Sequence, residues 1–231
     1  MQLKSTYEGY LFDVDGTLVD SIPMIVAGLT ATYHELAGIS LSEPEVRALI
    51  GIPLRVQMSQ FGLELSPMSL EERIEATLTN YQKFSHLQTG FGDALAAVQD
   101  ACSAGIPVAL VTSRNTLEVE HLLKDFPALA RVSTIVCASD TVRPKPSPDP
   151  ALLACERLSL SPHECLFIGD SRHDLDCARA AGCDFLAVAY GAASADALRP
   201  DSTELVNTPA ELRQTLTTLT ENSRCQLTRK I

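Results

Sequence analysis

The chain has 231 residues, which is enough for one large domain or two small ones. Hydrophobic residues make up 45% of the chain and charged residues 20%, so it can bury a core and is not expected to be disordered as a whole. The formal net charge is −11 and no Trp occurs, which disfavours binding to nucleic acids or to anionic membrane surfaces.

Cysteine usage and the N-terminus indicate the compartment. The seven cysteines include no CxxC pair, a pattern typical of free thiols in a reducing environment rather than of a zinc site. The first nine residues lack the apolar region of a signal peptide, and no run of about 20 apolar residues occurs. We therefore expect a cytoplasmic protein without a membrane span.

Short apolar runs bounded by turn residues recur along the chain and predict strands. They are continuous rather than alternating, as in strands that are buried on both faces. The runs are residues 10–12, 107–111, 134–137, 165–168 and 185–188, and helical patterns fill 92–105, 115–125, 148–159 and 172–181. This order predicts an α/β fold, with a Rossmann-like parallel sheet flanked by helices.

Residues 21–87 interrupt this alternation. Apolar residues repeat at helical spacing over 25–36 and 74–81, no convincing strand is present, and Pro44, Pro53 and Pro67 lie near expected helix starts. This pattern predicts a small helical module inserted after the first strand. Because the ends of an insertion usually lie close together, the module can cover the sheet as a lid. At the other end of the chain, residues 225–231 resemble a frayed tail.

Two carboxylates follow the first predicted strand. Asp13 and Asp15 are two residues apart, so in extended backbone their side chains point the same way. Ligands of open α/β sheets bind at the carboxyl ends of strands. One carboxylate of such a pair can act as nucleophile or metal ligand and the other as proton donor. The alternative is a polar Asp-Gly turn without a catalytic role.

A second acidic segment follows the strand predicted at residues 165–168. Asp170 lies directly beyond that strand, and Asp174 lies four residues later. Mg²⁺ prefers carboxylate oxygens, so Asp13, Asp170 and Asp174 are candidate ligands. Ser171 and Asp174 also have the spacing of a capping box at a helix start, and Asp174 can serve both purposes.

Two further segments carry candidate phosphate-binding groups. Thr112 and Ser113 follow the strand at 107–111, where hydroxyls can hold phosphoryl oxygens, although Ser113 or Asn115 could instead cap the next helix. Lys145 lies between two prolines that fix its backbone, which suits an ammonium placed against phosphate charge. The alternative for Lys145 is an ordinary surface lysine in a proline-rich loop.

Together, and in this order, the four segments resemble the haloacid dehalogenase superfamily of phosphohydrolases. The residues that match its motifs are, in order, Asp13-Val14-Asp15-Gly16-Thr17, Thr112, Lys145, and Gly169-Asp170-Ser171 with Asp174. The resemblance covers nearly the whole chain. It implies a Rossmann-like catalytic core at residues 1–18 and 88–231 and an α-helical cap domain at 19–87.

The resemblance also implies a mechanism. Asp13 would attack phosphorus and form an aspartyl-phosphate, and Asp15 would protonate the leaving alcohol and then deprotonate the attacking water. Mg²⁺ would be held by Asp13, Asp170, Asp174 and the carbonyl oxygen of Asp15, while Thr112 and Lys145 would balance phosphoryl charge. The expected activity is that of a phosphoric monoester hydrolase, a phosphatase.

The substrate is expected to be a small phosphorylated metabolite, with phosphoglycolate as the first candidate, because Asp20-Ser21 and Pro23 are similar to phosphoglycolate-phosphatase-like members. Ser113-Arg114 stands where many relatives carry Asn-Lys. In the cap, Arg47 and Arg55, which flank Gly51, are candidates to meet a substrate carboxylate or second phosphate, or else belong to solvated helix faces.

Two other functions stay open at this point. The same site suits a phosphosugar mutase of the β-phosphoglucomutase type, which would return the phosphoryl group to the sugar. A catalytically inactive binding protein on the same fold would not need all of the matching residues, so their joint presence favours an enzyme. We expect a monomer or homodimer with a small phosphorylated substrate as its partner.

Overall fold

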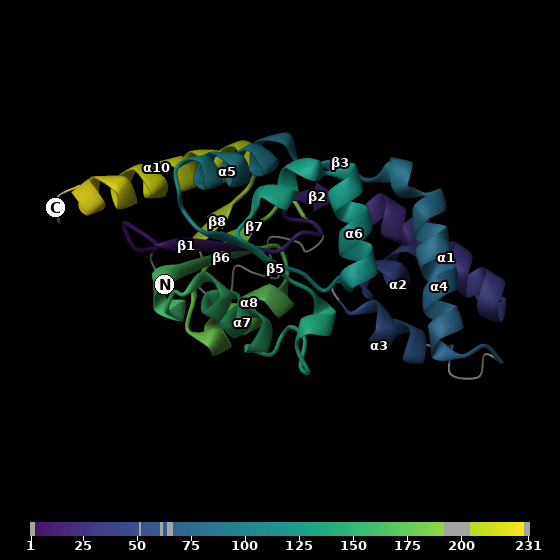
Figure 1. The fold of residues 1–231 in the computed structure, drawn as a ribbon. Helices are drawn as coiled ribbons and strands as arrows, with labels where there is room; N and C mark the ends of the chain where they lie inside the picture. The colour runs from purple at the N-terminus through teal and green to yellow at the C-terminus, as the bar shows by residue number, and fades with distance from the viewer. Residues whose placement is uncertain (1–2, 51, 61, 64–66, 192–203, 229–231) are drawn as a thin grey trace.

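The computed structural model describes residues 3–50, 52–60, 62–63, 67–191 and 204–228. At its centre lies a six-stranded sheet in the order β5-β4-β1-β6-β7-β8, and every neighbouring pair of these strands is parallel (Figure 1). The strands are β1 (Gly9–Phe12), β4 (Val108–Val111), β5 (Thr134–Val136), β6 (Cys165–Gly169), β7 (Asp184–Val188) and β8 (Glu204–Val206). The predicted α/β Rossmann-like fold is therefore confirmed.

Both faces of the sheet are covered, which explains the continuous apolar runs. Side chains of β1 alternate between two clusters: Tyr10 and Phe12 join one, and Leu11 joins the other. The first cluster lies under α5 (Gly92–Ser103) and α10 (Pro209–Thr228), and the second under α7 (Asp149–Leu158) and α8 (Arg172–Ala181). Helix α6 (Thr116–Asp125) contributes Leu122 to the first cluster.

A helical segment follows β1 and has a hydrophobic cluster of its own, which includes Leu29, Tyr33, Met58 and Leu78. It contains α1 (Ile22–Ala37), α2 (Glu43–Arg47), α3 (Leu54–Ser59), α4 (Leu70–Lys83) and the short 3-10 helix η1 (Ser85–Leu87), and it lies on the right in Figure 1. The predicted helices at 25–36 and 74–81 correspond to α1 and α4. The division into two domains at residues 18/19 and 87/88 stays a prediction.

The segment leaves and rejoins the core through two strands that pair with each other. Strand β2 (Val19–Asp20) lies antiparallel to β3 (Thr89–Gly90), with Val19 opposite Gly90 and Asp20 opposite Thr89. These strands have two residues each, too few to give a periodic sequence pattern. The remaining short 3-10 helices are η2 (Pro127–Arg131), η3 (Ala138–Asp140) and η4 (Pro162–Glu164).

The C-terminal part differs from the sequence prediction. Strand β8 and helix α10 were not anticipated, yet α10 buries Leu212, Leu216 and Leu219 at helical spacing against the sheet. The expected frayed tail at 225–231 is wrong for its first residues, because α10 continues to Thr228, and residues 229–231 lie outside the described part. The packing of these leucines makes α10 part of the core.

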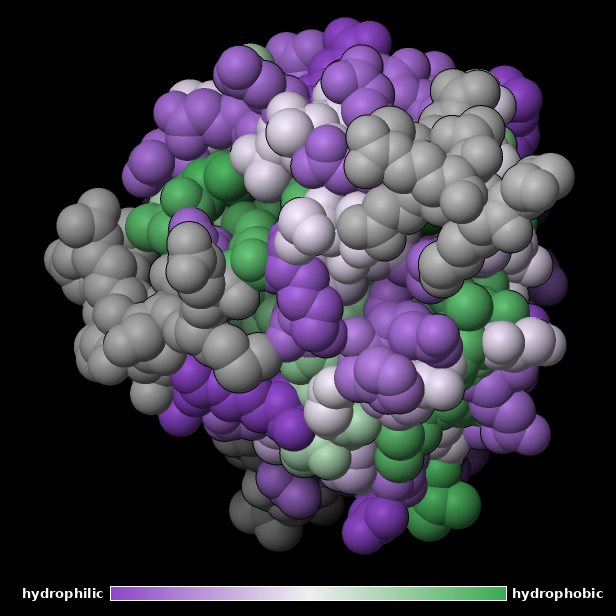
Figure 2. All heavy atoms as spheres, turned by 90° about the vertical axis from the view of Figure 1, so that its left-hand side faces the viewer, coloured by the Kyte–Doolittle hydropathy of each residue, from purple (hydrophilic) through white to green (hydrophobic). Residues whose placement is uncertain are grey.

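In the described ranges, no helix is long and apolar enough to cross a bilayer. The face of the core turned away from the helical segment is mostly hydrophilic, with hydrophobic residues in small separate groups (Figure 2). Scattered hydrophobic residues of this kind are ordinary for a protein surface.

The burial of α10 predicts the effect of truncating one of its leucines. Leu212→Ala should lower the free energy of unfolding by about 2–5 kcal/mol, because it removes apolar contacts and leaves a cavity against the sheet. The measurement is urea denaturation followed by circular dichroism. Thr218→Ala, at an exposed position of the same helix, should stay within about 0.5 kcal/mol of wild type. An equally small loss for Leu212→Ala would mean that α10 is not part of the core.

Candidate active site

A cavity of about 480 Å³ opens at the carboxyl ends of the central strands. Its floor includes Asp13, Lys145 and Asp170, and its opposite wall comes from the helical segment, with residues such as Leu54 and Leu78. Strand β1 pairs with β4 on one side and β6 on the other, so the chain order reverses here. Ligands of open α/β sheets bind at such a reversal.

Asp13 and Asp15 both line this cavity, as their spacing predicted. The Asp13 N–H donates to the carbonyl oxygen of Ile168 at 2.9 Å, which extends the pairing of β1 and β6 by one residue. The Asp13 side chain is therefore fixed at the end of the sheet, with only 5% of the residue exposed.

Lys145 is buried in the site and is not a surface lysine. Its Nζ donates to a carboxylate oxygen of Asp13 at 2.6 Å, to one of Asp174 at 2.7 Å, and to the carbonyl oxygen of Val111 at 3.0 Å. Burial alone would lower the pKa of Lys145, but the two carboxylates raise it above its usual value. The ammonium is thus held in its charged form between two acids.

Asp13, Asp170 and Asp174 form a buried cluster whose carboxylate oxygens lie within 4.8 Å of one another. Asp174 also accepts hydrogen bonds from the backbone N–H and the hydroxyl of Ser171 at the start of α8. The capping role predicted for Asp174 is thus present alongside its place in the cluster. Three hard oxygen donors in one place fit Mg²⁺, which prefers carboxylates.

Two glycines allow the cluster to form. A Cβ atom at Gly169 would lie 2.6 Å from the Cβ of Asp174, and one at Gly191 would lie 2.3 Å from a carboxylate oxygen of Asp170. Both distances are shorter than real contacts permit. The backbone at these positions must therefore lack a side chain for Asp170 and Asp174 to approach so closely.

The two N-terminal acids have opposite electrostatic surroundings. Burial and the charge of Asp174 raise the pKa of Asp13 to about 7, although Lys145 acts in the other direction. Burial alone would raise the pKa of Asp15, but the guanidinium of Arg114 lowers it below its usual range. In this arrangement Asp13 therefore binds a proton more readily than Asp15 does.

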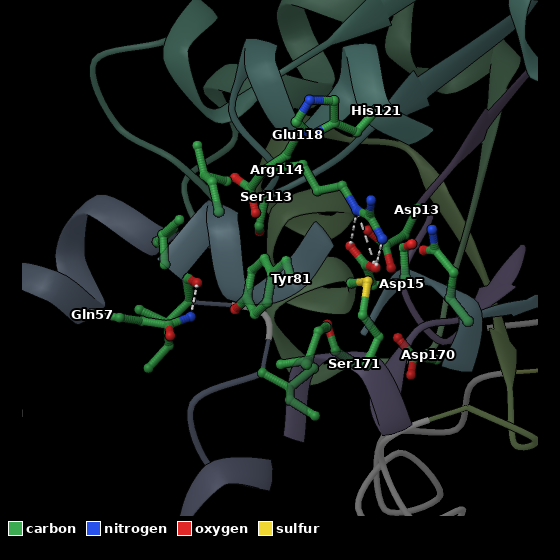
Figure 3. A pocket seen from close by; sticks show the side chains of 18 of the residues that line it. Asp13, Asp15, Gln57, Tyr81, Ser113, Arg114, Glu118, His121, Asp170 and Ser171 are labelled. Atoms are coloured by element: carbon green, nitrogen blue, oxygen red, sulfur yellow. Dashed lines mark hydrogen bonds and ion pairs between the residues drawn. The ribbon is translucent and has the colours of Figure 1, made fainter. Parts of the chain in front are cut away.

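Arg114 is a site residue that the sequence analysis did not identify. Its Nε donates to Asp15 at 3.0 Å and its Nη2 donates to the other carboxylate oxygen at 2.7 Å, so the pairing is bidentate (Figure 3). The Ser21 hydroxyl donates to the same carboxylate. The sequence signals were its position after β4, the strand beside β1 in the sheet, and its place in the Ser113-Arg114 pair, where many relatives carry Asn-Lys.

Thr112 and Ser113 are placed differently from each other. Thr112 is buried, its hydroxyl accepts a hydrogen bond from the Arg114 N–H at 3.1 Å, and it does not line the cavity. Ser113 does line the cavity, and its buried Oγ has no hydrogen-bond partner within the described residues. Asn115 caps α6, which is the alternative foreseen from the sequence. Phosphate binding by Thr112 and Ser113 stays a prediction.

Only one of the two cap arginines reaches the cavity. Arg47 lines it and pairs with Glu43 at 2.8 Å, whereas Arg55 lies on the surface, where it pairs with Glu71 at 3.1 Å. Gly51 lies outside the described residues. A direct contact between Arg55 and a substrate in this cavity is therefore not supported by its position.

Comparison with known proteins gives consistent relatives. The sequence profile of the haloacid dehalogenase-like hydrolases matches residues 10–188. The N-acetylmuramic acid 6-phosphate phosphatase of Pseudomonas aeruginosa is 32% identical over 197 residues, which cover 83% of this chain and 84% of that protein. The phosphoglycolate phosphatase of Escherichia coli strain K12 is 30% identical over 208 residues, which cover 79% of this chain and 81% of that protein.

Solved structures share the fold. CbbY from Rhodobacter sphaeroides in complex with phosphate superposes with a TM-score of 0.76 at 23% identity, over 90% of this chain and 96% of that chain. A hydrolase from Pseudomonas syringae superposes with a TM-score of 0.76 at 22% identity, over 90% of this chain and 97% of that chain. At this identity the likeness concerns the arrangement of elements alone.

The raised pKa of Asp13 predicts a stability effect with a defined sign. In the folded protein this pKa is about 7, whereas in an unfolded chain it is about 3.9. The stability linked to this group is therefore fully present below about pH 4 and is lost as the pH rises through about 7. Asp13→Asn should raise the melting temperature of the metal-free protein at pH 8 and change it much less at pH 4.

Thermal unfolding in EDTA, followed by circular dichroism at both pH values, measures this effect. Asp93→Asn, an exposed position on α5, is the matched control and should behave alike at both pH values. An equal change in melting temperature for Asp13→Asn at pH 4 and pH 8 would contradict the raised pKa.

Proposed function

Because the chain belongs to the haloacid dehalogenase-like hydrolases, as its four segments predicted, we propose that it hydrolyses a small phosphate monoester with Asp13 as the nucleophile. One observation carries the proposal: Lys145 bridges Asp13 and Asp174 beside Asp170, at the floor of a cavity large enough for a metabolite. The phosphatases among the relatives support the same reaction.

In the first step, a carboxylate oxygen of Asp13 attacks phosphorus. A bond forms between that oxygen and phosphorus while the bond to the leaving alcohol breaks, which gives an aspartyl-phosphate. Lys145 lies 2.6 Å from Asp13, so it orients the nucleophile and offsets the negative charge of the arriving phosphoryl group. Ser113, whose hydroxyl has no hydrogen-bond partner among the described residues, would supply a further donor in the cavity.

Asp15 moves the protons. It would protonate the oxygen of the leaving alcohol in the first step and accept a proton from the attacking water in the second. The Arg114 guanidinium donates to both carboxylate oxygens of Asp15, and the Ser21 hydroxyl donates to one of them, so the Asp15 carboxylate has a defined direction in the cavity. We infer that Arg114 is a positioning residue for this proton transfer.

Mg²⁺ fits the cluster of Asp13, Asp170 and Asp174, which would hold it together with the carbonyl oxygen of Asp15. When bound, the ion supplies positive charge to the phosphoryl oxygens. The helical segment at residues 19–87 lines the opposite side of the cavity, and in this proposal it acts as the cap that excludes water. The assignment of residues 1–18 and 88–231 to the catalytic core belongs to the same proposal.

Hydrolysis of p-nitrophenyl phosphate tests the proposed function. The purified protein should release p-nitrophenol with Mg²⁺, lose this activity in EDTA, and regain it when Mg²⁺ is restored. Asp13→Asn should abolish turnover, because an amide is a poor nucleophile. Asp93→Asn, exposed on α5, should keep wild-type turnover and is the matched control.

Two results would contradict the proposal, each in a different part. Full activity in EDTA would remove the metal from the mechanism. Wild-type turnover by a folded Asp13→Asn variant would remove the covalent step.

The contact between Arg114 and Asp15 predicts a dependence on the leaving group. Arg114→Ala should lower kcat by about 10²-fold for an alkyl phosphate, because a misplaced Asp15 no longer protonates the departing oxygen. The loss should be much smaller for p-nitrophenyl phosphate, whose leaving group needs little protonation. Arg157→Ala on α7, an exposed arginine paired with Asp140, is the matched control.

Steady-state kinetics across a series of phosphate esters measures this dependence. Losses of the same size for good and poor leaving groups would show that Arg114 does not act through Asp15.

A further inference from the structure

The backbone turn that begins at Asp15 lies against a segment from a distant part of the chain. Tyr190 and Gly191 follow strand β7, and the Tyr190 hydroxyl donates to the carbonyl oxygen of Thr17 at 2.9 Å. A Cβ atom at Gly191 would lie 2.3 Å from the carbonyl oxygen of Gly16, so Gly191 packs on the same turn. Two adjacent residues thus contact this turn, although Tyr190 and Thr17 are 173 positions apart in sequence.

Most of the turn is stabilised by its own backbone hydrogen bonds. The Val14 carbonyl oxygen accepts from the Val19 N–H at 3.0 Å, and the Gly16 N–H donates to the Val19 carbonyl oxygen at 2.8 Å. The Thr17 carbonyl oxygen differs, because no backbone N–H of the described residues donates to it. Thr17 is fully buried, so solvent cannot replace the Tyr190 hydroxyl as a donor, and an unpaired carbonyl oxygen there would be costly.

Tyr190 is itself fixed from two sides. Its ring meets Phe91 edge to face, with ring centres 4.8 Å apart, and the Phe91 N–H donates to the carbonyl oxygen of Leu18 at 3.0 Å. The Ala189 N–H donates to the Val206 carbonyl oxygen at 2.9 Å, which continues the pairing of β7 with β8 up to the residue before Tyr190. Burial raises the pKa of Tyr190 above its usual value, so the hydroxyl keeps its proton and remains a donor.

The position of Asp15 depends on its backbone as well as on its carboxylate. The Arg114 guanidinium donates to the carboxylate, whereas the turn fixes the backbone from which the side chain projects. In the proposed reaction this carboxylate has to reach the leaving oxygen while Asp13 attacks phosphorus, and a misplacement of about 1 Å in such a group can cost about 10²-fold in rate. A contact that fixes the turn therefore supports the proton transfer without touching the substrate.

We propose that Tyr190 is a positioning residue for Asp15, because its hydroxyl anchors the turn at the Thr17 carbonyl oxygen. This inference rests on the proposed phosphatase function and adds to it a residue outside the cavity, since the described residues that line the cavity do not include Tyr190. The phenol takes no part in bond making or proton transfer. Tyr190 and Arg114 both act on Asp15, Tyr190 through the backbone and Arg114 through the carboxylate.

Tyr190→Phe tests the proposal, because it removes the hydroxyl and keeps the ring that packs against Phe91. The kcat/KM for phenyl phosphate should fall about tenfold, because a less well placed Asp15 protonates the departing phenol poorly. The kcat/KM for p-nitrophenyl phosphate should fall by at most about threefold, since its leaving group needs less protonation. This parameter reports the steps up to formation of the aspartyl-phosphate, in which the leaving group departs.

Hydrogen exchange followed by mass spectrometry measures the turn directly. In Tyr190→Phe, the amides of residues 16–19 should exchange at least about threefold faster than in wild type, because the turn opens more easily once the Thr17 carbonyl oxygen is unpaired. Tyr10→Phe is the matched control. The Tyr10 and Thr220 hydroxyls lie 3.1 Å apart in the core, so this variant also loses a buried tyrosine hydrogen bond, but away from the turn. It should change neither the exchange of residues 16–19 nor the ratio of kcat/KM for the two esters.

Circular dichroism checks that each variant is folded. Wild-type exchange of residues 16–19 in Tyr190→Phe would overturn the proposal, and so would losses of equal size for the two esters. Absence of any hydrolysis of p-nitrophenyl phosphate by the wild type would instead refute the proposed function itself, and the exchange experiment would still test whether Tyr190 anchors the turn.

Discussion

The ammonium of Lys145 lies between the carboxylates of Asp13 and Asp174, and all three side chains are almost entirely buried. Three buried acids around one point would repel each other strongly without it, since the surrounding protein screens their charges less than water does. The cation also ties the loop that follows β5 to the ends of β1 and β4, through its bond to the Val111 carbonyl oxygen. One side chain thus stabilises both the charge arrangement and the strand ends that carry it.

A second ion pair organises the neighbouring acid. Arg114 and Asp15 are both largely buried, and their bidentate contact leaves little freedom to either side chain. The two pairs divide the cavity floor into a part where carboxylates crowd around one lysine and a part where a single carboxylate is matched by a guanidinium. This asymmetry accounts for the opposite directions of the pKa shifts of Asp13 and Asp15.

Much of the sheet and the location of the cavity follow from local sequence patterns. Runs such as 165–168 are apolar throughout because helices cover both faces of the sheet, and acids directly beyond them meet because parallel strands end at one edge. The direction of Arg114 could not be predicted, since it depends on the position of Asp15, 99 residues away in sequence. Whether Thr112 or Ser113 faces the cavity depends on the backbone conformation of the loop that leads into α6. The leucines of helix α10 recur at helical spacing, but the many polar residues between them made this pattern hard to recognise in the sequence.

The pairing of β2 with β3 has a consequence for how the molecule can vary. The chain leaves the core at Val19 and returns at Gly90, and these two residues are direct partners in the antiparallel pair. The core therefore requires only that the ends of the helical segment lie about 5 Å apart, the spacing of adjacent strands. Changes in the length or composition of that segment need not shift the positions of β1, β4 or β6. A different helical segment could therefore replace this one without a change in the sheet. The residues that line one half of the cavity can then differ while the acids of the other half keep their positions.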